Sequence, residues 1–168
     1  TILNSTIKGG DQINFEKSLG LLNLLLYKNQ TLSNDLVFYY PLLCYLIVGK
    51  PNKSLSVQDV PEEMLELLEK VGQKDGWLDD LSIITGCLLN YIQKLGEGFL
   101  KATDFYGLSF PALLFEVIKK IGSESIETEQ EWNLIYSMTI LMGFVENLPG
   151  LIDDFLPQIV GLVRELLS

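Results

Sequence analysis

Three stretches of the chain set a proline beside apolar residues at helical spacing. They read FYYPLLCYLIVGK, LSFPALLFEVIKK and DFLPQIVGLVREL, and their prolines, Pro41, Pro111 and Pro157, are separated by 70 and 46 residues. Apolar residues that recur every three or four positions indicate a helix that buries one face. A proline inside such a helix removes a hydrogen bond and clashes with the preceding turn, at a cost of about 3 kcal/mol.

The first turn of a helix tolerates proline, because its backbone N–H groups have no partner within the helix. Ser109 and Asp154 stand two or three residues before Pro111 and Pro157, where a side chain can cap the helix. We therefore expect each proline to mark a helix start. The 46-residue spacing matches a HEAT or armadillo repeat of roughly 40 to 47 residues.

The rest of the chain predicts helices and no strand. The expected class is all-α, a HEAT-like α-solenoid of about seven helices in antiparallel hairpins, with residues 1–168 as one segment of a longer array. Hairpins are predicted over 14–49, 78–121 and 128–168, with an extra helix over 59–72. The individual helices are expected over 14–28, 35–48, 59–72, 78–95, 105–121, 131–147 and within 148–167. The polar stretch 122–130 is predicted to connect two of them.

Histidine is absent from the chain. This excludes Ser-His-Asp and Cys-His nucleophilic sites, an imidazole general base and histidine-ligated zinc. The two cysteines, Cys44 and Cys87, lie in apolar helical stretches without metal-site spacing, so we expect buried reduced thiols. No catalytic residue, cofactor or metal ligand is predicted, and the chain is not expected to be an enzyme.

The charge balance bears on partners. Twelve basic and 22 acidic residues give a net charge of −10, which disfavours nucleic acid and anionic membranes and suits basic protein partners. The longest apolar run covers 13 residues, from 36 to 48, and is shorter than the roughly 20 that cross a bilayer. We therefore expect no membrane insertion.

The candidate partner-binding residues lie off the apolar stripes or beside polar connections. In the last helix Asp154, Gln158 and Glu165 fall at helical steps that place them on one side, and Glu116 lies comparably on the preceding proline-opened helix. Trp77 and Trp132 lie near helix starts, where partial exposure is expected. An ordinary solvated surface is the alternative interpretation for each acidic cluster.

Residues 88–122, LLNYIQKLGEGFLKATDFYGLSFPALLFEVIKKIG, resemble a HEAT repeat of the importin-β (karyopherin) family. Residues 136–167, YSMTILMGFVENLPGLIDDFLPQIVGLVRELL, are similar, and 20–50 more loosely so. The resemblance implies a curved protein-binding scaffold of a nuclear transport receptor. It implies cargo, the GTPase Ran and Phe-Gly nucleoporins as partners, in the cytoplasm and nucleus.

Two alternatives to a transport receptor stay open at this point. One is a HEAT or armadillo scaffold of another assembly, such as a phosphatase, cytoskeletal or chromosomal complex. The other is a compact all-α enzyme that uses carboxylates.

Overall fold

The computed structural model describes residues 12–49, 81–128 and 131–167, with five single positions between residues 51 and 69. This part of the chain is helical, as predicted, and its one β pairing is an isolated bridge between Thr103 and Ser109. The elements are α2 (Gln12–Lys28), α3 (Asn34–Val37), α4 (Tyr39–Val48), α6 (Leu81–Leu95), α7 (Glu97–Lys101), α8 (Phe110–Thr128), α9 (Glu131–Asn147), the 3-10 helix η2 (Asp153–Phe155) and α10 (Leu156–Leu167).

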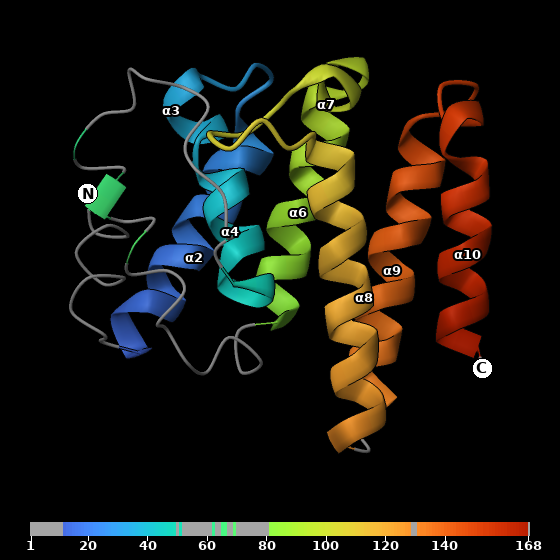
Figure 1. Ribbon diagram of the computed structural model, residues 1–168. Helices are drawn as coiled ribbons and strands as arrows, with labels where there is room; N and C mark the ends of the chain where they lie inside the picture. The colour runs from blue at the N-terminus through green and yellow to red at the C-terminus, as the bar shows by residue number, and fades with distance from the viewer. Residues whose placement is uncertain are drawn as a thin grey trace.

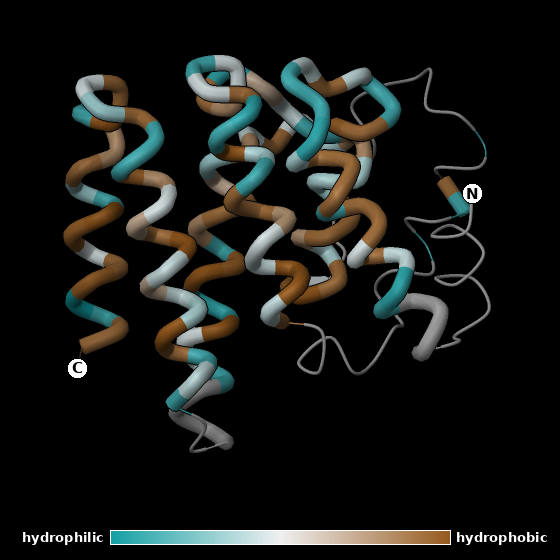
Figure 2. The backbone as a smooth tube through the Cα atoms, turned by 180° about the vertical axis from the view of Figure 1, so that it is seen from behind, coloured by the Kyte–Doolittle hydropathy of each residue, from teal (hydrophilic) through white to brown (hydrophobic). Residues whose placement is uncertain are grey.

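The long helices pack in two rows. In one row α6 packs against both α2 and α9, and in the other α8 packs against both α4 and α10. Figure 1 shows α4 and α8 in front of α6 and α9, with α10 at the far end of the molecule from α2. Apolar and polar segments alternate along each helix in Figure 2, as expected for helices that bury one side and expose the other.

Small residues bring neighbouring helices close together. The Ser137 hydroxyl of α9 donates to the Ile118 carbonyl of α8 at 3.0 Å, and it lies close to Gly122. A Cβ placed on Gly143 of α9 would lie 2.2 Å from the Leu89 side chain of α6. These positions explain why α9 packs so extensively on both α8 and α6.

The predicted hairpins place α8 in one pair, over 78–121, and α9 in the next, over 128–168. In the structure α8 and α9 nevertheless pack extensively against each other. The division itself stays a prediction. Most of the predicted extra helix over 59–72 lies outside the described residues. Its four described positions, 62, 65, 66 and 69, have helical conformation.

The prediction that the prolines open helices is confirmed. Pro111 and Pro157 are the second residues of α8 and α10, and Pro41 is the third residue of α4. The single helix expected over 35–48 is instead divided at Phe38, where α3 ends and α4 begins. Proline explains the break, because Pro41 has no N–H to donate to the carbonyl of Val37 one turn earlier.

The helix expected over 105–121 has different bounds, and the reason at its start is a turn. The Asp104 carboxylate accepts hydrogen bonds from the N–H groups of Tyr106 and Leu108, at 3.0 and 2.7 Å. A side chain that occupies these N–H groups competes with helix formation. The helix therefore starts at Phe110, with the predicted cap Ser109 accepting from the N–H of Ala112 at 3.2 Å.

At its other end α8 continues to Thr128, through the stretch that was predicted as a connection. Lys120 and Glu124 form an ion pair at 2.9 Å, and the Ser123 hydroxyl donates to the Lys119 carbonyl at 3.0 Å. Polar residues with such pairs extend a helix as well as they form a loop. The prediction of a loop over 122–130 is wrong up to residue 128.

Two groups of aromatic side chains lie within a mainly aliphatic core. The Tyr40 ring lies within 5.5 Å of the rings of Tyr91, Phe99 and Phe110, and its hydroxyl donates to the Phe110 carbonyl at 2.7 Å. A second cluster centres on Phe144, a fully buried residue of α9. It contacts the rings of Phe99, Phe115 and Phe155.

Both cysteines are free and buried in this core, as the sequence predicted.

Candidate binding groove

Three of the predicted partner-binding residues line one groove between α8 and α10. Glu116 comes from α8, and Gln158 and Glu165 come from α10. The groove has a volume of about 270 Å³, and its remaining lining residues are Ala112, Phe115, Lys119, Gly161 and Leu162. The structure therefore brings together residues that lie up to 49 positions apart in the sequence.

The two ends of the space between α8 and α10 differ in width, and a glycine lies at each. A Cβ on Gly122 would lie 2.3 Å from the Leu166 side chain, so α8 and α10 are in close contact there and only about 50 Å³ remains open beside them. A Cβ on Gly161 would meet nothing within 4 Å, and the groove is open at this position. The space between the helices thus widens toward the start of α8.

The floor is apolar. Phe115 and Leu162 are buried, and their edges form the base between the two helices. The Phe115 ring packs against the rings of Phe144 and Phe155, at 5.3 and 6.0 Å between centroids. Because these contacts tie α8 to α9 and η2, the floor is a continuation of the protein core.

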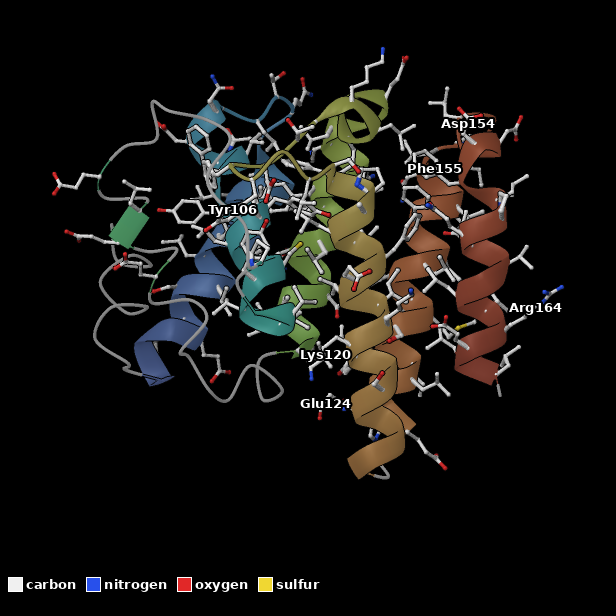
Figure 3. The ribbon with its side chains drawn as sticks, in the orientation of Figure 1. Tyr106, Lys120, Glu124, Asp154, Phe155 and Arg164 are labelled. Atoms are coloured by element: carbon white, nitrogen blue, oxygen red, sulfur yellow. The ribbon has the colours of Figure 1, made fainter. Side chains whose placement is uncertain are left out.

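The rim is acidic on balance. Glu116 and Glu165 contribute two carboxylates, and Lys119 contributes one ammonium group. Figure 3 shows that Lys120 and Glu124 project from the side of α8 that faces away from α10, and that Arg164 points away from α8. Lys120 and Arg164 therefore point away from the groove.

Two of the other three predicted partner-binding residues, Asp154 and Trp132, lie outside the groove. Asp154 belongs to η2, which runs directly into α10, and it does not line the groove. Figure 3 shows it at one end of α10. Trp132 lies on α9 with 69% of its surface exposed, outside the groove. Trp77 lies outside the described residues.

The sequence did not identify four of the residues that line the groove, namely Phe115, Leu162, Lys119 and Gly161. Phe115 and Leu162 have core spacing in their helices, and nothing in the sequence shows that each also borders open space. Lys119 and Gly161 likewise stand out only when α8 and α10 are placed side by side. Gly161, three residues after Gln158 and four before Glu165, was an available signal, since glycine weakens a helix and often marks a special packing position.

The buried titratable groups belong to the core and do not line the groove. Burial raises the pKa of the Cys87 thiol to about 12 and raises the pKa of Cys44 and Tyr40 well above their usual values. The described residues contain no group of three or more acidic, cysteine or histidine side chains that could hold a metal ion. Among the described helices, none combines the length and apolar character needed to cross a membrane.

No family model, curated protein or solved structure matches the chain. The resemblance to importin-β repeats therefore rests on the quoted sequence stretches alone.

Proposed function

We propose that this chain is a non-catalytic protein-binding scaffold whose α8–α10 groove holds a basic segment of a partner. The observation that carries the proposal is the convergence of Glu116, Gln158 and Glu165 on one groove with an apolar floor. A basic segment with interspersed aliphatic residues would fit, because its cations would meet the two carboxylates while its aliphatic side chains cover Phe115 and Leu162. The net charge of −10 favours the same class of partner.

The groove is tested by fluorescence anisotropy with a labelled peptide that alternates lysine and leucine. A peptide that alternates glutamate and leucine serves as the control ligand. Replacing Glu116 and Glu165 together by lysine should weaken binding of the basic peptide about tenfold, because two rim carboxylates are worth about 1 to 2 kcal/mol in total. The effect should shrink at high salt.

A matched variant distinguishes the groove from overall charge. Glu16 and Glu97 lie exposed on α2 and α7, and their double replacement by lysine changes the net charge by the same amount. This variant should bind the basic peptide almost as the natural chain does. Equal losses in the two double variants would show that binding follows net charge alone, and the groove proposal would be wrong.

A more specific form of this proposal is that the chain is a HEAT-like solenoid segment of a nuclear transport receptor. In that form it binds cargo, Ran or Phe-Gly nucleoporins in the cytoplasm and nucleus. The two rows of helices support it, because stacked helical pairs add one helix to each row per repeat. Purified Ran in its GTP-bound and GDP-bound forms tests this version. Binding that depends on GTP would support it, whereas equal or absent binding would leave a scaffold of another assembly.

A further inference from the structure

The first and last helices of the row α2–α6–α9 each expose an apolar stripe. The α2 stripe consists of Leu21, Leu24 and Leu25, which are 41% to 52% exposed. The α9 stripe consists of Ile135, Met142 and Val145, which are 37% to 56% exposed. Residues at steps of three, four and seven share one side of a helix, so each set lies on one side of its helix, with the exposed Thr139 between Ile135 and Met142 on α9.

The opposite side of α2 carries its packing contacts. Leu19 and Leu26 of α2 are fully buried, and Asn23 accepts a hydrogen bond from the Asn90 amide of α6 at 2.6 Å. The α2 stripe is thus a second apolar face, separate from the face that packs on α6.

The same holds for α9. Ser137, Ile140 and Phe144 face the interior of the protein and are fully buried. The α9 stripe lies on the other side of the helix. It shares no residue with the α8–α10 groove.

The two stripes carry opposite charges at their ends. Lys17 and Lys28 lie on the same side of α2 as its stripe, before and after the leucines, and both are exposed. Glu131 and Glu146 occupy the corresponding positions around the α9 stripe and are also exposed. At 1.5 Å per residue the lysines are about 16 Å apart along the helix and the glutamates about 22 Å. Extended lysine and glutamate side chains can cover the difference.

We propose that the α2 stripe of one copy of this chain docks on the α9 stripe of a second copy. The leucines would cover Ile135, Met142 and Val145, with a lysine meeting a glutamate at each end. Because the two stripes are different surfaces, the contact is head-to-tail and leaves one stripe of each kind free at the ends of the assembly. Trp132, which lies beside Glu131 at the start of α9, would border the contact.

Sedimentation of the natural chain over a concentration series gives the first test. We expect the mass to rise with concentration and to pass that of a dimer, since a head-to-tail contact repeats. Leu24→Glu and Met142→Glu each place a carboxylate in one stripe, and each should weaken association at least about tenfold. Val160→Glu on α10 is the matched control, because Val160 is 47% exposed and belongs to neither stripe.

Mixing the two stripe variants gives the sharpest test. The Leu24→Glu chain keeps its α9 stripe and the Met142→Glu chain keeps its α2 stripe, so the mixture should form one-to-one dimers and nothing larger. If Leu24→Glu alone still forms dimers, two α9 stripes contact each other and the proposal is wrong. A natural chain that stays monomeric at every concentration, or a control variant that also blocks association, overturns it as well.

Charge exchange tests the end pairs. Replacing Lys17 and Lys28 by glutamate should weaken self-association, and adding Glu131→Lys and Glu146→Lys to the same chain should restore it. Circular dichroism checks that each variant keeps its helical content. Failure of the fourfold variant to recover association, with its fold intact, would contradict the proposed pairing.

Discussion

Phe144 packs beneath the floor residue Phe115 of the binding groove, and its replacement tests that support. The ring is fully buried in α9 and contacts the rings of Phe99, Phe115 and Phe155, which lie on α7, α8 and η2. Phe144→Ala removes all three contacts and leaves a cavity beneath the groove floor. Buried Phe→Ala changes cost about 3 to 5 kcal/mol. For a chain of this length, that loss lowers the melting temperature by about 6 to 20 °C.

Urea unfolding followed by circular dichroism measures the effect, with Val160→Ala as the control. Val160 is about half exposed on α10, so its truncation should cost less than about 1 kcal/mol. The Phe144→Ala chain should also bind the basic peptide less well, because Phe115 loses the ring that supports it. A loss of stability below about 1 kcal/mol for Phe144→Ala would show that α9 does not pack against α8 and η2 as described.

Two further changes test local features. Replacing Pro111 or Pro157 by alanine should change the free energy of unfolding by less than about 1 kcal/mol, because first-turn proline costs a helix little. A gain in stability near 3 kcal/mol, measured by urea unfolding, would instead indicate that the prolines lie in helix interiors. Burial raises the pKa of Asp104 despite the hydrogen bonds from Leu108 and Tyr106. The raised pKa adds to the free energy of unfolding below the unfolded-state pKa, where the carboxyl group is protonated, and this contribution is lost as the pH rises through the folded-state pKa. Asp104→Asn should therefore stabilise the protein at pH 7 and lose this advantage near pH 3, and a destabilised variant at pH 7 would contradict the reasoning.

The helical class and the helix starts follow from local physics that the sequence displays directly. Apolar spacing of three and four residues requires helices, and the ring of Pro111 or Pro157 excludes every helical position except the first turn. The burial of Cys44 and Cys87 follows in the same way, because both lie on strongly apolar helix faces. These features depend on residues within a few positions of one another.

The helix bounds were predicted less well, because local signals conflict there. The stretch after Ile121 is polar enough for a loop, yet its side chains form pairs that extend α8. The residues around Asp104 have apolar character that suggests a helix, yet the carboxylate binds two backbone N–H groups and holds a turn. In both places the outcome depends on specific hydrogen bonds that composition does not reveal.

Only the tertiary structure decided which surfaces are open. The acidic candidates Glu116 and Glu165 could be identified as solvated residues, but their meeting across a groove required α8 and α10 to be placed side by side. An apolar stripe in a sequence indicates a buried face, and Leu24 and Met142 have such spacing although both are exposed. Burial depends on whether another helix covers the face, and that is a property of the packed molecule, since periodicity specifies only which residues share a side.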